Sequence, residues 1–241
     1  MNLVDLTGKR VLVTGASSGI GRACAILAAE LGASVVLTGR RSDALDETWR
    51  RMENPDQHLI VDGDITSADF VQELAQTVGK LDGLVHAAGI GPAVPIGMVD
   101  AVHVETVFRT NYVAFLDLMR VFGKTKYRNT PFSAVVVSSI AAEAGWGGVS
   151  VYAGSKGAVC ASVRALAMEL AAKGVRVNAV CPGHIDTPML DAVNRELLAA
   201  KQPLGIGRPV QVAAPVCFLL SDASSFMTGV NMPVDGGYLA Q

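Results

Sequence analysis

The chain has 241 residues, of which 50% are hydrophobic and 17% charged, and 22 acidic against 20 basic residues give a net charge of −2. This length can bury a substantial core, and we expect one domain over residues 1–241. The near balance of charge gives no reason to expect nucleic acid or an anionic membrane as a partner, and no apolar run reaches the roughly 18 residues of a membrane span.

The N-terminus "MNLVDLTGKRVLVTG" carries acids and a turn where a secretory signal would have an apolar centre. The four cysteines are widely spaced and have no histidine partners at metal-ligand spacing: Cys24, Cys160, Cys181 and Cys217. We therefore expect reduced core thiols in a cytoplasmic protein, without a metal site or disulfides.

Short β-branched runs alternate with longer helical patterns along the chain. In chain order we predict strand 10–15, helix 21–32, strand 34–39, helix 42–52, strand 58–65, helix 67–79, strand 81–89, helix 100–123, strand 132–140, helix 151–173, strand 174–183, a loop with a short helix over 184–206, helix 209–221 and a strand near 229–234. This alternation predicts a three-layer, doubly wound α/β fold whose mainly parallel sheet has seven strands. Such sheets bind ligands beyond the carboxyl ends of their strands.

The first strand-to-helix junction is rich in glycine. It reads "TGASSGIG" over 14–21, with three residues rather than one between the first two glycines. Gly15 allows a sharp turn, Gly19 lets the backbone approach a pyrophosphate, and Gly21 lets the helix pack closely on the sheet. The N–H groups of the helix N-terminus then face the phosphates. The junction predicts a dinucleotide site of the Rossmann type, and a glycine-rich turn without a ligand is the alternative.

The end of the second strand indicates which dinucleotide binds. NAD sites place an acid there, but this chain has Gly39 followed by Arg40 and Arg41. Two guanidinium groups can pair with a 2′-phosphate, and Arg22 could contribute. We therefore predict NADP(H) rather than NAD(H), with a solvated basic turn as the alternative.

The motifs taken together resemble the short-chain dehydrogenase/reductase family, in its small single-domain branch that includes the 3-oxoacyl-[acyl-carrier-protein] reductases. The match covers nearly the whole chain, and the motifs that carry it are "TGASSGIG", Asp64 in "DGDI", "HAAG" (86–89), Asn111, Ser139, "YAGSK" (152–156), "PGHIDT" (182–187) and "TGVNMPVDGG" (228–237). The chain departs from the family at His86, where Asn is most common, and at Gly154, where Ala is common. We interpret His86 as structural.

The resemblance implies roles for individual residues. The catalytic residues would be Asn111, Ser139, Tyr152 and Lys156. The cofactor-binding residues would be Gly15, Ser17, Ser18, Gly19, Ile20, Gly21, Arg40, Arg41, Asp64, Ile65, Ala88, Gly89, Tyr152, Lys156, Pro182, Gly183, Ile185 and Thr187. Among them, Asp64 would bind the adenine amino group, and Ile185 and Thr187 would hold the nicotinamide carboxamide. Asn111 would anchor a water that connects Lys156 to solvent.

The spacing of Tyr152 and Lys156 fits the reduction of a carbonyl. A nearby cation favours tyrosinate, so we expect Lys156 to lower the pKa of Tyr152 toward the operating pH of a general acid. Ser139 can donate to the same carbonyl oxygen. No nucleophile motif surrounds Ser139, so covalent catalysis is not expected. Taken alone, the Tyr–Lys pair could also be an ordinary exposed helix turn.

Three loops are expected to shape the substrate pocket: 90–97, 140–150 and 184–206. They offer Ile96, Trp146, Met189 and Leu190 but few charges apart from Glu143, Asp186 and Asp191. This predicts a neutral or apolar carbonyl or alcohol as substrate, and equally these apolar side chains could serve only packing. Acyl carrier protein could meet a basic cluster at Lys124, Lys126 and Arg128, which alternatively is the charged end of a helix.

The resemblance also implies a homodimer or homotetramer through a four-helix interface. Candidate interface residues, which could equally be core, are Val113, Phe115, Leu116, Val159 and Leu166. Other classes considered are a dehydrogenase of sugars or polyols, a non-catalytic dinucleotide sensor, which tends to lack the Tyr–Lys pair, and a nucleotide-sugar epimerase, whose chain is longer and whose glycine spacing differs.

Overall fold

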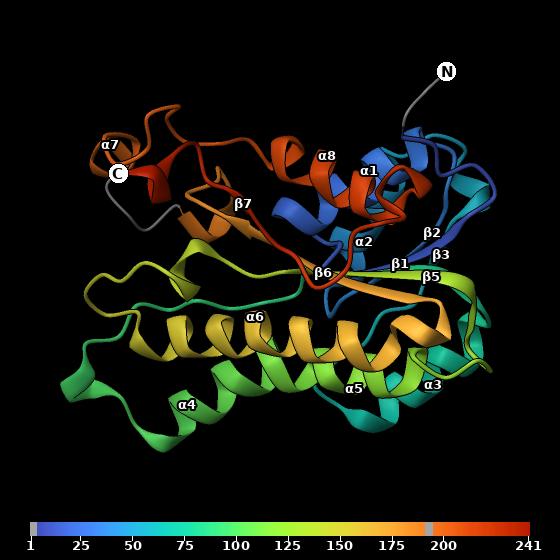
Figure 1. Ribbon diagram of the computed structural model, residues 1–241, viewed down its shortest axis with the longest axis horizontal. Helices are drawn as coiled ribbons and strands as arrows, with labels where there is room; N and C mark the ends of the chain where they lie inside the picture. Colours follow the sequence, from blue (N-terminus) through green and yellow to red (C-terminus); the bar gives the residue numbers. More distant parts are fainter. Residues whose placement is uncertain (1–3, 191–194) are drawn as a thin grey trace.

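The structure, a computed structural model, describes residues 4–190 and 195–241. One parallel sheet of seven strands forms its middle layer, in the order β3-β2-β1-β4-β5-β6-β7 (Figure 1). The strands are β1 (Arg10–Thr14), β2 (Ser34–Thr38), β3 (Leu59–Ile60), β4 (Leu81–His86), β5 (Arg128–Val137), β6 (Val175–Pro182) and β7 (Asn231–Val234). The predicted fold class is confirmed, and the point at which the order of the strands reverses falls between β1 and β4.

Helices cover both faces of the sheet. They are α1 (Gly19–Glu30), α2 (Ser42–Trp49), α3 (Ala68–Val78), α4 (Ala101–Phe108), α5 (Ala114–Phe122), α6 (Ser150–Leu170), α7 (Arg195–Ala199) and α8 (Pro209–Leu220). Figure 1 shows α1, α2 and α8 on one side of the sheet and α3 to α6 on the other. No helix among the described residues is long and apolar enough to span a membrane.

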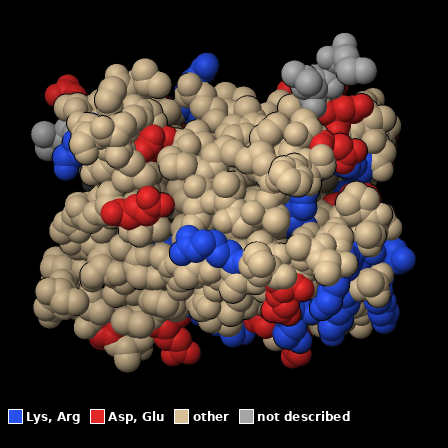
Figure 2. Space-filling model, in the orientation of Figure 1, with Lys and Arg blue, Asp and Glu red and all other residues tan. Residues whose placement is uncertain are grey.

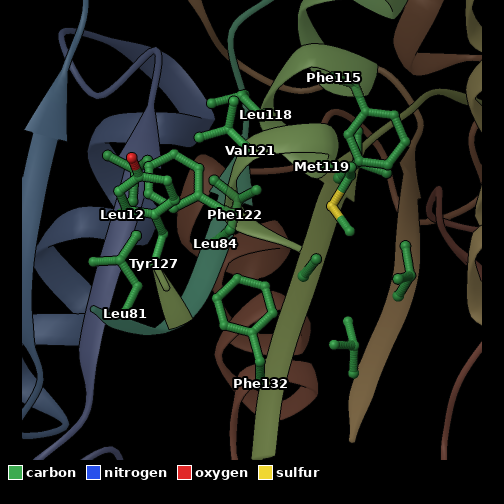
Figure 3. Close-up of a cluster of buried hydrophobic side chains, with 14 of the residues drawn as sticks. Leu12, Leu81, Leu84, Phe115, Leu118, Met119, Val121, Phe122, Tyr127 and Phe132 are labelled. Atoms are coloured by element: carbon green, nitrogen blue, oxygen red, sulfur yellow. The ribbon is translucent and has the colours of Figure 1, made fainter. Parts of the chain in front are cut away.

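Two hydrophobic cores separate the sheet from its helical layers. In the core below the sheet, Phe115, Leu118 and Phe122 of α5 face apolar side chains of β1, β4 and β5 (Figure 3). The other core packs α1 and α8 against the opposite face of the same strands. Phe115 and Val159 are fully buried in the first core, so these two candidate interface residues belong to the core instead.

Three predicted elements differ from the structure. The strand expected over 58–65 is regular only at Leu59–Ile60, although the Val61 and Gly63 N–H groups still donate to the Leu37 and Gly39 carbonyls. The extended segment ends where the chain turns at Asp64, whose carboxylate accepts from the Thr66 N–H at 2.9 Å. The fifth strand begins at Arg128 rather than 132. The helix expected over 100–123 is interrupted by a π-helical turn at Arg109–Val113, a feature that often marks functional sites.

Candidate active site

A pocket of about 490 Å³ opens at the carboxyl ends of the strands. Every residue predicted to bind the cofactor lines it, from Gly15 after β1 to Thr187 after β6, and so does Ser139. Asn111 does not line it. The pocket is also lined by residues that the sequence did not single out, among them Gly63, Thr66, Thr110, Ser138 and His184. Motifs separated by most of the chain therefore face one cavity, as the parallel sheet requires.

The glycine turn is built for close approach. Gly15 has φ +67°, and a side chain there would bring its Cβ within 2.8 Å of the Ala88 backbone, so the turn after β1 lies directly against the end of β4. A Cβ at Gly21 would overlap the Gly15 carbonyl oxygen. Ser18 precedes α1 without capping it through its side chain, which leaves the hydroxyl and the first N–H groups of α1 for a ligand. This cradle fits a dinucleotide pyrophosphate.

The arginines near the adenosine end divide into two kinds. Arg40 and Arg41 are exposed, line the pocket and form no ion pair within residues 4–190 and 195–241. Arg22 instead binds Glu47 at 2.9 Å and donates to the Ser17 carbonyl at 2.6 Å. The suggested contribution of Arg22 to phosphate binding is therefore wrong, because its guanidinium is already engaged in joining α1 to α2.

Asp64 lies at the rim of the same end. Its carboxylate accepts hydrogen bonds from the backbone and hydroxyl of Thr66, both at 2.9 Å, and these bonds, with Arg40 nearby, lower the pKa of Asp64. The side chain is therefore held ionised and oriented, as an acceptor for an amino group requires.

Tyr152 and Lys156 lie one turn apart on α6, at the other end of the pocket. The Lys156 ammonium is buried, donates to the Val137 carbonyl at 2.9 Å and lies 5.8 Å from the centre of the Tyr152 ring. Burial lowers the pKa of Lys156 to about 8. Ser139 follows β5, and its hydroxyl accepts from the Ala141 N–H at 3.1 Å, which fixes the side chain at the start of a short 3₁₀ turn.

The expected effect of Lys156 on Tyr152 is not present in this structure. Burial raises the pKa of Tyr152, and a hydrogen bond with Ser139 opposes the rise. The expectation of a lowered pKa was wrong for the protein without ligand, because it considered the helical spacing and not the cost of desolvating a phenolate. Tyr152 is thereby kept protonated, which is the state a proton donor needs.

Asn111 lies in the π-helical turn and is fully buried. Its amide exchanges two hydrogen bonds with the Ile90 backbone, both at 2.9 Å, and its Nδ2 donates to Ser155 at 3.0 Å. A Cβ at Gly89 would lie 3.2 Å from Asn111 Oδ1 and 3.4 Å from Lys156 Nζ, so the side chains of Asn111 and Lys156 both approach the backbone of Gly89. Asn111 thus ties the loop after β4 to α6, immediately behind the pocket.

His86 occupies the position where the family most often has Asn. The ring is 1% exposed, stacks on Phe115, and its Nδ1 lies 3.0 Å from the Thr14 hydroxyl. The same hydroxyl accepts from the Ala88 N–H at 3.3 Å. Burial lowers the pKa of His86 to about 3, so the ring is neutral and links β1 to β4 beneath the glycine turn.

The substrate end is apolar and is assembled from loops. It is lined by Trp146, Val149, Met189, Leu190 and Leu198. Ile96, which was expected here, is instead 76% exposed and lies outside the pocket. Glu143 is also exposed and also lies outside the pocket. Asp186 is exposed and does not line the pocket either, and Asp191 lies outside the described residues.

Sequence analysis assigned no role to His184, Gln202 and Tyr238, which hold the substrate end together around the expected Trp146. The rings of Trp146, His184 and Tyr238 contact one another, with centroids 5.6 to 6.2 Å apart. Gln202 is 3% exposed and accepts from the His184 N–H while its Nε2 donates to the Gly205 carbonyl at 2.7 Å. His184 stands inside the "PGHIDT" motif, but nothing in the sequence indicates that the C-terminal Tyr238 packs beside it.

The predicted basic cluster is only partly available. Arg128 is 2% exposed and donates to the carbonyls of Gly123, Asn129 and Lys173 and to the Thr130 hydroxyl. It therefore fastens the turn before β5 and cannot meet a partner, which leaves Lys124 and Lys126 at the surface. In the part of the chain that the structure describes, no three His, Cys, Asp or Glu side chains gather as a metal site.

Comparison with known proteins agrees with this geometry. A family described as "Enoyl-(Acyl carrier protein) reductase" matches residues 15–239. A cis-4-hydroxycyclohexanecarboxylate dehydrogenase of Sinomonas cyclohexanicum is 38% identical over 95% of this chain and 96% of its own. A 3-oxoacyl-[acyl-carrier-protein] reductase of Rickettsia felis is 36% identical over 98% of this chain and 99% of its own.

Solved structures with the same fold point to the same family as the sequence relatives. A short-chain type dehydrogenase/reductase from Mycobacterium marinum superimposes with a TM-score of 0.91 at 32% identity, over 100% of this chain and 99% of that one. Relatives above 30% identity that span both chains establish family membership, and the family's enzymes are oxidoreductases that bind NAD(P)(H). The chain belongs to the short-chain dehydrogenase/reductase family and is an oxidoreductase of that family.

Proposed function

We propose that the chain, acting as a single Rossmann-fold domain, is an NADP(H)-dependent oxidoreductase that interconverts an uncharged ketone and a secondary alcohol. The observation that carries this proposal is the shared pocket. The glycine turn and Arg40 lie at one end of it, and Ser139, Tyr152 and Lys156 at the other. A dinucleotide held by the first group would present its nicotinamide to the second.

The chain's own residues would handle the proton and the developing charge. The cofactor supplies the hydride. The Tyr152 hydroxyl, kept protonated by burial, would donate its proton to the carbonyl oxygen. The Ser139 hydroxyl would stabilise the charge on that oxygen. Lys156, fixed by the Val137 carbonyl, would hold a cation next to the phenol, and Asn111 would keep the β4 loop and α6 in register.

The preference for NADP(H) is proposed from the two available arginines. Arg40 and Arg41 reach the pocket rim without ion-pair partners among residues 4–190 and 195–241, and Gly39 stands where a carboxylate would bind an unphosphorylated ribose. A guanidinium pair can bind a 2′-phosphate in a bidentate manner. Asp64 would accept from the adenine amino group, and Ile185 and Thr187 would contact the carboxamide.

Two substrate classes have support. The apolar lining at the substrate end and the 3-oxoacyl reductase relatives favour a linear 3-oxoacyl thioester, carried by acyl carrier protein or coenzyme A. The 38% identical relative that oxidises a hydroxycyclohexane ring favours a cyclic ketone or alcohol, for which the aromatic wall at Trp146 is suited. We place the linear thioester first.

Oxidation of NADPH and NADH in the presence of a linear 3-oxoacyl thioester and of a cyclic ketone would test the proposal. We expect turnover with NADPH on at least one of them, and a lower rate with NADH. Tight binding of NADPH without turnover of any carbonyl compound would contradict the assignment of the reaction. Equal use of both cofactors would contradict only the cofactor preference.

We further propose that two copies associate through α4, α5 and α6. Met168 is 83% exposed, Val102 70% and Val104 38%, and half-buried Leu116 and Leu166 lie between them and the core. Figure 2 shows few charged side chains over α4 and the first half of α6. Apolar areas of this kind on a soluble chain mark interfaces.

Sedimentation would show a dimer or tetramer for the wild type and a smaller species for Met168→Glu. A wild-type monomer would contradict this proposal.

A further inference from the structure

Two of the four cysteines lie sulfur to sulfur directly behind the catalytic end. Cys160 stands on α6, one turn after Lys156, and Cys181 is the residue before Pro182 at the end of β6. Their Sγ atoms are 3.8 Å apart, and both side chains are buried. The other two cysteines, Cys24 and Cys217, are also buried, but within the described ranges no sulfur–sulfur contact joins them.

The pair is connected to the pocket through its polar neighbours. Ser138 lines the pocket, and its hydroxyl lies 3.2 Å from Cys160 Sγ and donates to the Lys156 carbonyl at 3.1 Å. Pro182, which also lines the pocket, follows Cys181 directly. Each cysteine therefore adjoins a residue of the pocket wall, and a molecule as small as hydrogen peroxide would have to reach the sulfurs past these residues.

Cys160 also differs from the other three thiols. The hydrogen bond between the two sulfurs lowers the pKa of Cys160 and raises that of Cys181. Negative charge on either sulfur opposes the lowering of the Lys156 pKa by burial. Burial in an apolar core instead raises the pKa of Cys24, and it raises that of Cys217 to about 12. Since the thiolate is the nucleophile, Cys160 is the reactive member of the four.

We propose that Cys160 and Cys181 are a redox modification site, which hydrogen peroxide converts to a reversible disulfide that stops turnover. The Cys160 sulfur attacks the peroxide, forming an S–O bond and breaking the O–O bond, and the leaving hydroxide takes up a proton to become water. The Cys181 sulfur then attacks the sulfenic sulfur, forming the S–S bond and releasing a second water. Two thiols thus lose two electrons and two protons to one peroxide.

The disulfide would disturb the site because it needs a shorter distance. The sulfurs must approach from 3.8 Å to a bond length of about 2.0 Å, which draws α6 toward the end of β6. Lys156 and Tyr152 lie one and two turns before Cys160 on α6, and the Ser138 contact joins that helix to the segment after β5 that carries Ser139. A displacement of about 1 Å in catalytic groups costs up to about a hundredfold in rate, so we expect a loss of about tenfold to a hundredfold.

Peptide mapping of peroxide-treated full-length protein tests the bond itself. Trypsin without reductant should release residues 157–164 and 177–195 as one linked species, which dithiothreitol separates. The double variant Cys24→Ser/Cys217→Ser is the matched control and should give the same linked species, whereas Cys160→Ser and Cys181→Ser should not. Free thiols at Cys160 and Cys181 after treatment of the wild type would overturn the proposal.

The effect on turnover rests on the proposed function, whereas the mapping does not, so the two can fail separately. Peroxide should lower the rate of the wild type and of the Cys24→Ser/Cys217→Ser control, and dithiothreitol should restore both. Cys160→Ser and Cys160→Ala should keep turnover in peroxide. Linked peptides in a wild-type protein whose turnover rate is unchanged would contradict the proposal that the disulfide stops turnover. An equal loss of rate in Cys160→Ser would contradict it as well.

Discussion

The two ends of the pocket are built in different ways. The cofactor end is formed mainly by backbone and short side chains at the ends of β1 and β4, where Gly15 packs on Ala88 and His86 on Thr14, with two arginines after β2 at the rim. The substrate end is formed by large side chains from three loops and the C-terminus, among them Trp146, His184 and Tyr238. The first arrangement fixes a ligand common to a whole family, and the second leaves the substrate to side chains that can be exchanged without changing the sheet.

Removing the phenolic hydroxyl of the proposed general acid is expected to have the largest effect. Tyr152→Phe should lower kcat by about 10²–10⁴-fold because a general acid contributes this much, while NADPH binding stays as in the wild type. Steady-state kinetics and a binding titration measure the two quantities. Tyr127→Phe, whose hydroxyl accepts from Gln72 far from the pocket, is the matched control. A Tyr152→Phe enzyme with the wild-type rate would contradict the assignment of the acid.

A charge reversal tests the cofactor end alone. Arg40→Asp should weaken NADPH binding by about ten- to hundredfold, since a hydrogen bond between charged groups contributes about 1.5–3 kcal/mol, and should leave NADH binding unchanged or improved. Fluorescence titration of both nucleotides gives the ratio. The same exchange at Arg50, which is exposed but outside the pocket, should not change that ratio. Parallel losses for both nucleotides would contradict a 2′-phosphate site at Arg40.

The buried histidine beneath the glycine turn makes the stability of this end depend on pH. The pKa of His86 is lowered from 6.5 to about 3, so the unfolded chain binds a proton that the folded chain does not, and stability falls as pH drops below 6.5. Between pH 6.5 and about pH 5 this amounts to about 1.5 kcal/mol. In urea titrations, His86→Asn should lack this part of the acid loss. An unchanged pH dependence would show that another group is responsible.

The smallest expected effect belongs to the substrate end. Trp146→Ala should raise KM about three- to tenfold for a substrate that packs on the ring, in line with about 0.5–1.5 kcal/mol for an aromatic contact, and leave NADPH binding unchanged. Ile96→Ala, in the neighbouring loop but outside the pocket, should leave KM unchanged. If both variants behave alike, the wall at Trp146 does not contact the substrate.

The same contrast explains what could be predicted from the sequence. The sheet and the pocket-lining positions of the glycine turn, Arg40 and Asp64 follow from local patterns, because strand ends and glycines determine backbone geometry. The substrate end depends on contacts between distant segments, so Tyr238 was missed and Ile96 was placed wrongly.

Burial was the other quantity that spacing did not reveal. Arg128 was expected at the surface and binds backbone carbonyls inside, and Phe115 belongs to the core. The pKa of Tyr152 is raised rather than lowered for the same reason, since desolvation of the buried phenol is the largest effect on it. A helical pattern gives the angular position of a side chain but not the depth at which it lies.

The π-helical turn at Arg109–Val113 also determines how this chain can change in length. A π turn holds one residue more than an α turn, so a single deletion there would restore a regular helix instead of breaking one. Because the π turn takes up its extra residue by widening, the helical segments on either side of the deletion would keep nearly their orientation. The residues within the turn would be displaced, so the Asn111 amide would no longer face Ile90. A shortened descendant of this protein could keep its fold at this point only by losing the link between the β4 loop and the catalytic helix.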